Sequence, residues 1–390
     1  MSDCVSNDRS FLNKDSRNGY KTWDEQSSPL SKGHVNGHEA YTAEEDLIVS
    51  VPHGLSLMKK KLVLHVDLNN TILVSDAVTS QGTVAALEYF ISTVTWGRMS
   101  QKGKWEWMSD SPSLLPPCIG AVSYYSQFGR VPGFTSSAEG RRFRGVLDEH
   151  LAMLRWPEEL KRDRELTVKG EDGQLYHWIL PSFFQLLRDL VAEGREFAIL
   201  FRTFGSDLPR VLSAMSRVLT QTSHPLFPDL PALKLNVNEM PGQICCSKKG
   251  VVMSRAEDHF STHDGERALY QYLSFVQGLG GFQDHFDWWA RNDYSNLGGK
   301  PLWVDPFDQN VQHIFIDDNI RQNDKDTIVH PKVFLEQGGS ETRTASTSEL
   351  YDLCLVQTDL LRAISDPGYF SQRINICQEN YDRNLQQGAG

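Results

Sequence analysis

Three short apolar runs set narrow limits on how this chain can fold. They lie at residues 61–66 (KLVLHV), 196–201 (EFAILF) and 313–316 (HIFI). None of them alternates apolar and polar residues in the way of a strand with one face in water. Each run therefore predicts a strand buried on both faces, and such strands belong to parallel sheets covered by helices.

Helical patterns are expected between these strands. Residues 181–193 begin with Pro181 and place apolar side chains on one face, and Gly194 follows where a C-terminal cap belongs. After the second run, Ser206 or Asp207 can cap a further helix. Helices that alternate with buried strands predict the α/β class, with a Rossmann-like, doubly wound parallel sheet.

The chain has 390 residues, which suits a main domain with insertions. Residues 1–58 are polar with few apolar anchors, so we expect a disordered tail before an α/β core at 59–385. About 130 residues separate the first two strands, far more than one crossover needs. The aromatic-rich part at about 97–175 predicts an inserted module beside the ligand edge of the sheet. A second insertion is expected at about 225–298, with a hairpin around 247–250.

Composition and missing motifs exclude several classes of function. The formal net charge of −11 argues against nucleic acid and against anionic membranes as general partners. No C-x-x-C pair supports a zinc site, and no glycine-rich phosphate loop or G-x-S-x-G motif occurs. The sequence has neither an apolar signal core nor a bilayer-length apolar stretch, so we expect a cytoplasmic protein. The oligomeric state cannot be predicted.

Polar residues follow each predicted strand. Asp67 ends the first run, Thr203 follows the second, and Asp317 and Asp318 follow the third. Lys300 comes after a glycine pair and before a proline. Ligands of open parallel sheets bind at the carboxyl edge of the strands, so we expect these side chains to meet there.

Each of these residue types suits phosphate chemistry. A rigidly held carboxylate such as Asp67 can attack phosphorus and form an aspartyl-phosphate. A hydroxyl beside a helix N-terminus, as at Thr203, suits a phosphate oxygen. Lys300 can neutralise phosphoryl charge. The adjacent acids Asp317 and Asp318 are costly at the end of a buried strand unless a cation offsets them, and Mg²⁺ with oxygen ligands is the natural partner.

Taken singly, most of these residues also have a commoner structural role. Asp67 can cap a turn, Thr203 can cap a helix, and Lys300 can be a solvated loop residue. Lys248 or Lys249 can take the place of Lys300. Only the acid pair of Asp317 and Asp318, considered by itself, favours a functional role over a structural one, because the strand before it is so apolar.

The order strand-D-x-[DN]-x-T, strand-T, K-P, strand-DD resembles the haloacid-dehalogenase-like (HAD) superfamily of phosphatases and phosphotransferases, over roughly residues 60–335. The resemblance implies Asp67 as the nucleophile, Thr203 and Lys300 as phosphate-binding residues, and Lys300 also as the stabilising lysine. It implies Mg²⁺ bound by Asp67, the backbone carbonyl of Asn69, Asp317 and Asp318. It also implies a cap between the first two motifs, and a small phosphorylated molecule or a phosphoprotein as substrate.

Asn69 departs from this pattern. Phosphatases of the superfamily usually carry a second aspartate at that position, which protonates the leaving group and then activates water. An amide does neither at neutral pH, and losing a general acid/base costs about 10²–10⁴-fold in rate. We therefore expect a Mg²⁺-dependent phosphoryl hydrolase acting through Asp67, and the substitution at Asn69 allows its turnover to be slow. The alternative is a catalytically degenerate HAD-like protein that binds a phosphorylated ligand or a protein partner.

Overall fold

The computed structural model of this protein describes residues 59–75, 81–221, 224–322 and 327–388. The predicted disordered tail at 1–58 lies outside the described residues. None of the helices formed by the described residues is both long enough and apolar enough to cross a membrane.

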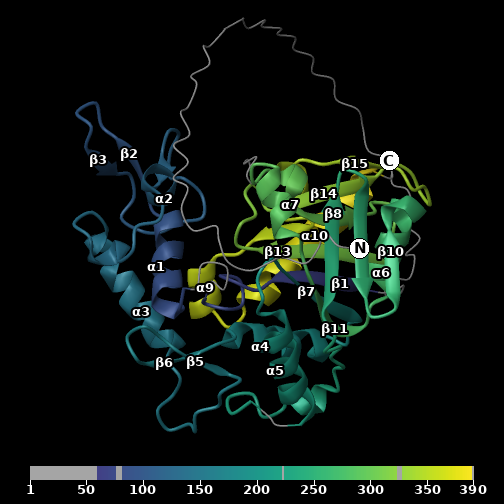
Figure 1. Cartoon of the computed structure of the whole chain (residues 1–390), viewed down its shortest axis with the longest axis horizontal. Helices are drawn as coiled ribbons and strands as arrows, with labels where there is room; N and C mark the ends of the chain where they lie inside the picture. The colour runs from purple at the N-terminus through teal and green to yellow at the C-terminus, as the bar shows by residue number, and fades with distance from the viewer. Residues whose placement is uncertain (1–58, 76–80, 222–223, 323–326, 389–390) are drawn as a thin grey trace, which may run out of the picture. The chain divides into compact units, whose positions relative to one another are not determined.

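The central element is a sheet of eight strands. They are β1 (Lys61–Asp67), β7 (Phe197–Thr203), β8 (Gly242–Ser247), β9 (Gly250–Arg255), β10 (Asp258–Ser261), β11 (Gly278–Gln283), β13 (Val311–Asp317) and β16 (Leu355–Gln357). Their order is β10-β9-β8-β11-β7-β1-β13-β16. Figure 1 shows the sheet with most of these strands labelled. Neighbours from β8 to β16 are parallel, whereas β9 and β10 pair antiparallel at one edge. The predicted α/β class with a mostly parallel sheet is confirmed.

The three apolar runs form the middle of this sheet, as predicted. Every residue of β1 and β7 is buried, which is why neither sequence shows polar alternation. β1 lies between β7 and β13. In the parallel register Asp67 pairs with Arg202, and Val66 pairs with Ile316. The three strands therefore end at nearly the same level, and the residues after them share one edge.

Different elements cover the two faces of the sheet. Leu64 and Val66 of β1 join an apolar cluster with α4 (Pro181–Ala192) and α5 (Leu208–Thr220), two helices that the sequence predicts. Val63 joins a second cluster with α6 (Glu266–Phe275) and a small sheet. That sheet consists of β12 (Lys300–Val304), β14 (Val329–Phe334) and β15 (Thr342–Thr344). Side chains alternate along a strand, so Asp67 leaves β1 on the same face as Val63.

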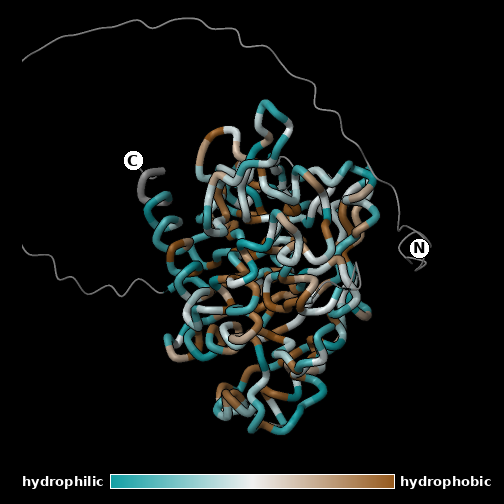
Figure 2. Tube along the Cα trace, turned by 90° about the vertical axis from the view of Figure 1, so that its left-hand side faces the viewer, coloured by the Kyte–Doolittle hydropathy of each residue, from teal (hydrophilic) through white to brown (hydrophobic). Residues whose placement is uncertain are grey.

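The other helices lie at the margins of the sheet. They are α1 (Thr83–Thr93), α7 (Phe286–Arg291), α8 (Thr347–Leu350), α9 (Leu360–Ser365) and α10 (Tyr369–Gly388). Residues of α1, α9 and α10 join the same apolar cluster as α4 and α5. Figure 2 shows apolar stretches gathered inside the folded part of the chain, with hydrophilic segments prominent on its outer loops.

The aromatic-rich stretch at 97–175 builds small elements of its own. They are β2 (Trp96–Met99), β3 (Trp105–Trp107), β4 (Val122–Ser123), α2 (Tyr124–Phe128), α3 (Arg144–Leu154), β5 (Thr167–Lys169) and β6 (Leu175–His177). Trp107 packs against Tyr124, Phe134 and Phe143, with ring centroids 4.9 to 6.3 Å away. The aromatic residues that mark this stretch in the sequence therefore pack largely on one another.

The stretch at 225–298 contributes directly to the central sheet. The predicted hairpin is confirmed, because Ser247 of β8 pairs with Gly250 of β9. The insertion predicted at about 225–298 includes β11. That part of the prediction is wrong, because β11 pairs with β7 within the parallel sheet. Glycines hide β11 in the sequence, since they are depleted in ordinary strands. Gly281 is needed there because a Cβ would lie 2.5 Å from the Leu208 side chain of α5.

Candidate functional site

Three buried carboxylates meet at the carboxyl edge of the sheet. Asp67 is the last residue of β1, Asp317 is the last residue of β13, and Asp318 follows it. One oxygen from each lies within 4.8 Å of the others. All three side chains are buried. The neighbouring parallel strands thus bring together the acids that the sequence predicts to meet.

Lys300, the first residue of β12, lies between two of these acids. Its Nζ donates to Asp67 Oδ1 at 2.6 Å, to Asp317 Oδ2 at 2.8 Å and to the carbonyl oxygen of Arg202 at 3.2 Å. Gly299 lets the chain approach closely here, since a Cβ would lie 2.4 Å from the Ile328 carbonyl oxygen.

The competing lysines lie elsewhere. Lys248 and Lys249 are exposed on the turn between β8 and β9. Lys300 is 1% exposed and in direct contact with Asp67. Of the three lysines considered from the sequence, Lys300 is the one that reaches the acidic group.

The charges at this site do not balance. Three ionised carboxylates and one ammonium would leave an excess of two negative charges. Burial, opposed by Lys300 and assisted by Asp317, raises the pKa of Asp67 to about 7. Burial and the charges of Asp317 and Asp67 raise the pKa of Asp318 well above its ordinary value. A divalent cation with oxygen ligands would offset the excess charge, so the donor set fits such an ion.

The turns after β1 and β13 hold the acid pair in place. The Asp318 backbone N–H donates to Thr71 Oγ1 at 3.1 Å, and the Asn319 N–H donates to Asp317 Oδ1 at 2.8 Å. The turn after β1 includes Asn70 with φ of 56°, a conformation that asparagine tolerates better than most residues. Thr71, which completes the D-x-N-x-T pattern, therefore links the two loops.

Thr203 lies at the same edge, one strand away from Asp67. It is the last residue of β7 and follows Arg202, the register partner of Asp67. Its Oγ1 accepts from the Gly205 N–H at 2.9 Å, which leaves its hydroxyl hydrogen for another acceptor. The predicted position of this hydroxyl at the carboxyl edge is therefore found, and α5 begins shortly after it.

Asn69 has side-chain partners that the sequence does not reveal. Its Nδ2 donates to the Ser75 carbonyl oxygen and to Asp207 Oδ2, both at 3.1 Å. Asp207 occupies the N-cap position of α5, as the sequence allows, but its side chain makes no capping hydrogen bond. Sequence reasoning missed this contact because 138 residues separate its partners.

A second buried polar network borders the acidic group and was not predicted. Arg202 of β7 binds Asp284 through two hydrogen bonds of 2.6 and 2.9 Å. Its Nη1 lies 3.1 Å from His65 Nδ1, His65 Nε2 lies 3.0 Å from His313 Nδ1, and His313 Nε2 lies 2.9 Å from Ser274 Oγ. Here the arginine and aspartate charges cancel, and each ring nitrogen has a partner.

The module at 97–175 borders the site through α1. Tyr89 of α1 is half-buried, and its pKa is raised by desolvation and by the nearby Tyr125 and Asp318. The Tyr89 ring packs edge-on against Tyr125, with centroids 5.1 Å apart. The Arg130 guanidinium lies 4.3 Å from the centre of the same Tyr89 ring. Residues of the module are thus close to the acid pair.

Comparison with protein-family models, with curated proteins and with solved structures finds no match for this chain.

Proposed function

We propose that this protein is a Mg²⁺-dependent phosphoryl hydrolase of the HAD type that works through an aspartyl-phosphate on Asp67. The observation that carries the proposal is the contact of Lys300 Nζ with both Asp67 and Asp317, at 2.6 and 2.8 Å. This contact brings residues from three of the motifs that carry the HAD resemblance into one buried, acidic group. A merely structural ion pair would not need the third carboxylate, Asp318.

The proposed reaction has two steps. An oxygen of Asp67 attacks phosphorus, the bond to the leaving oxygen breaks, and an aspartyl-phosphate forms. Water then attacks the phosphorus, which releases inorganic phosphate and restores the carboxylate. Lys300 and the Thr203 hydroxyl would contact the phosphoryl oxygens and stabilise their charge. Bound Mg²⁺, held by Asp67, Asp317 and Asp318, would neutralise phosphoryl charge and help to position the transferred group.

Asn69 limits the rate in this proposal. Its amide can neither protonate the leaving oxygen nor activate the water. Substrates with good leaving groups are therefore expected to react fastest, and hydrolysis of the aspartyl-phosphate is expected to be slow.

Phosphate release from a panel of phosphomonoesters tests this function. We expect Mg²⁺-dependent release by the wild-type chain, little release with excess chelator, and loss of at least about 10³-fold in Asp67→Asn. Lys249→Gln, a change in an exposed lysine of the β8–β9 turn, is the control and should keep wild-type activity. Equal rates for wild type and Asp67→Asn would exclude the proposed nucleophile.

One observation favours a second candidate, a catalytically degenerate protein that binds a phosphorylated ligand. The Asn69 amide is engaged by Asp207 and Ser75, so this position is built into the loop contacts. The degenerate protein would release no phosphate, and Asn69→Asp would restore at most weak activity. A new carboxylate beside Asp207 would have a raised pKa, which suits a general acid. Robust wild-type turnover that depends on Asp67 would exclude this candidate.

A further inference from the structure

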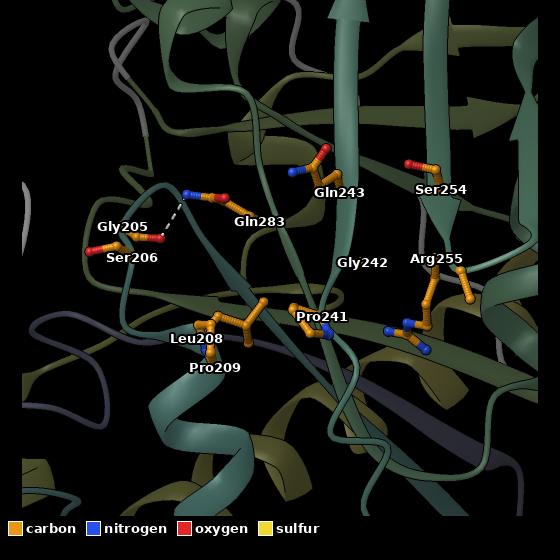
Figure 3. Close-up of a pocket in the computed structure, with 11 residues that line it drawn as sticks. Gly205, Ser206, Leu208, Pro209, Pro241, Gly242, Gln243, Ser254, Arg255 and Gln283 are labelled. Atoms are coloured by element: carbon orange, nitrogen blue, oxygen red, sulfur yellow. Dashed lines mark hydrogen bonds between the residues drawn. The ribbon is translucent and has the colours of Figure 1, made fainter. Parts of the chain in front are cut away.

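A cavity of about 350 Å³ opens beside the acidic group, between the loop after β7 and the ends of β8, β9 and β11. Figure 3 shows Gly205, Ser206 and the start of α5 on one side of it, and Ser254 and Arg255 on the other. Gln283 closes the upper part through a hydrogen bond of 3.1 Å from its Nε2 to the Gly205 carbonyl oxygen. None of the residues described above as phosphate or metal contacts lines this cavity.

Strand register places the cavity one residue beyond the level of Asp67 along the sheet edge. Thr203 pairs with Gln283, Gln283 pairs with Gln243, and Gln243 pairs with Ser254, so these residues follow one another along the sheet edge. β11 is two strands from β1. Neighbouring strands are about 4.8 Å apart, so the near wall of the cavity is roughly 10 Å from Asp67. A small molecule can span that distance.

Arg255 brings a buried positive charge to this cavity. It is 8% exposed, and among the described residues that line the cavity it alone carries a charge. Its Nη2 donates to the Gly281 carbonyl oxygen at 2.9 Å, and its guanidinium lies 4.2 Å from the centre of the Phe282 ring. Its Nε is buried without a hydrogen-bond partner, and no described carboxylate forms an ion pair with it.

Burial works against this charge. It lowers the pKa of Arg255, against the opposite effects of Tyr272 and of Asp258, the residue opposite Arg255 in the β9–β10 strand pair. An arginine nonetheless stays protonated in proteins. A buried charge without a counter-ion is costly, whereas the same charge paired with an anion through several hydrogen bonds is not.

The opposite wall also favours an anion. α5 is a helix of 13 residues whose N-terminus has no side-chain cap. Leu208 and Pro209 of its first turn line the cavity, so the positive end of the helix dipole is directed toward it. Asp207, the acid closest in sequence to this wall, has its carboxylate bound to Asn69. Two independent features, a buried arginine and an uncapped helix N-terminus, thus flank the same space.

We propose that this cavity is a subsite for an oxyanion, either a carboxylate or a phosphate, and that Arg255 is its cationic partner. The inference that this oxyanion belongs to the substrate rests on the proposed function at Asp67. The substrate class is then a small phosphomonoester that carries a second anionic group roughly 10 Å from the phosphorus, two strand spacings along the sheet edge.

Direct binding tests the subsite without any reaction. Sulfate and succinate are titrated calorimetrically into the full chain at constant ionic strength and without Mg²⁺. Arg255→Gln should weaken binding of at least one of them by about tenfold or more, and Arg255→Lys should recover part of it. Arg210→Gln, an exposed arginine on the same helix α5, removes the same charge and should change affinity less than about twofold.

Two results would overturn the subsite. One is wild-type affinity in Arg255→Gln at an unchanged urea midpoint, and the other is the absence of sulfate and succinate binding to the wild type. If Arg255→Gln fails to fold, Arg255→Lys replaces it, and equal affinity in that variant for both anions at every pH tested counts against the subsite.

Kinetics then test whether the anion belongs to the substrate. Matched phosphomonoesters with and without a second anionic group are compared in wild type and Arg255→Gln. The wild type should prefer the doubly anionic ester by about tenfold or more in kcat/KM, through KM, and Arg255→Gln should lose this preference while keeping kcat on the plain ester. If the wild type hydrolyses neither ester, the proposed function fails and the binding result alone decides the subsite. If the wild type hydrolyses both esters without preference, the proposed function stands. Only the assignment of the bound anion to the substrate then fails.

Discussion

Two buried polar clusters meet at Lys300, and only one of them balances its charge. In the network of Arg202, Asp284 and the two histidines, a bidentate ion pair cancels both charges at 0% and 1% side-chain exposure. In the acidic group, Asp67, Asp317 and Asp318 face a single ammonium. Burial is equally deep in both, so burial alone does not distinguish a structural cluster from a functional one.

The charge balance does distinguish them. A network in which every charge and polar atom has a partner within the protein does not require an ion or ligand from solution. Binding a ligand would not stabilise it further. A buried group with excess charge is held in place by the surrounding fold and becomes favourable when a counter-ion binds. Arg255 is a related case of opposite sign, since its guanidinium is buried and its Nε has no hydrogen-bond partner among the described residues.

The largest expected effect comes from breaking the balanced network. Arg202→Met would leave the Asp284 carboxylate buried without its partner, at a cost of about 3–5 kcal/mol in the free energy of unfolding measured by urea denaturation. The double variant Arg202→Met/Asp284→Asn should recover part of this loss, because no unpaired charge remains. A loss below about 1 kcal/mol in the single variant would mean that the network is not the buried ion pair described.

Mg²⁺ should stabilise the acidic group and leave the balanced network unaffected. At a free concentration of 100 Kd, an ion that binds the folded chain alone adds about 2.7 kcal/mol to the free energy of unfolding. Asp317→Asn removes a ligand and should lose most of this gain, measured by urea denaturation with and without Mg²⁺. Ser274→Ala, in the balanced network, is the matched control and should keep the full gain. Equal Mg²⁺ stabilisation in Asp317→Asn and wild type would contradict the metal site.

The balanced network should also have its own pH dependence. Burial, opposed by Asp308 and assisted by Lys61, lowers the pKa of His313 from 6.5 to about 3. The folded state therefore holds His313 neutral while the unfolded state takes up a proton below pH 6.5. Its contribution to stability is present above pH 6.5 and is lost as pH falls toward 3, by at most about 1.4 kcal/mol per pH unit.

His313→Gln measures that contribution, because an amide does not titrate in this range. Its free energy of unfolding should fall less steeply than that of the wild type between pH 6.5 and the acid limit of folding. His65, whose pKa is lowered by burial, Arg202 and His313, keeps part of the slope in both proteins. Parallel curves for wild type and His313→Gln would contradict the buried neutral histidine.

The smallest expected effect on the free energy of unfolding has opposite signs in the two clusters. Asp318 makes no ion pair with Lys300, and burial with the charges of Asp317 and Asp67 outweighs the opposing effects of Arg321 and Lys300 in raising its pKa. Asp318→Asn should therefore raise the free energy of unfolding without Mg²⁺ by about 1 kcal/mol, whereas Asp284→Asn in the balanced network should lower it. Urea denaturation of both variants in chelator measures the two signs. Destabilisation by Asp318→Asn would show that its carboxylate is not in excess.

Much of this site could be predicted from the sequence, because strand ends in a parallel sheet share an edge. The apolar run before Asp67 and the run before Asp317 identified two adjacent strands, and the order of the motifs brought in Lys300. Both strands could be predicted from short stretches of sequence, since a strand buried on both faces is a nearly continuous run of apolar residues.

The rest depends on contacts between segments that are distant in sequence. Asn69 and Asp207 form a pair across 138 residues, and nothing near either residue indicates the other. β11 is hidden by its glycines, of which Gly281 lies against Leu208 of α5. The burial of Arg255 depends on the edge of that unpredicted strand, because its guanidinium binds the Gly281 carbonyl oxygen.

The most direct test of the central claim is to detect the phosphoryl group on Asp67 itself. The wild-type chain is mixed with Mg²⁺ and an aryl phosphate, quenched in acid, digested and examined by mass spectrometry. Because Asn69 cannot activate water, the aspartyl-phosphate should accumulate on the peptide that contains Asp67, disappear on treatment with hydroxylamine, and be absent in Asp67→Asn. Phosphate release by the wild type with no such adduct, or an adduct that persists in Asp67→Asn, would contradict the account.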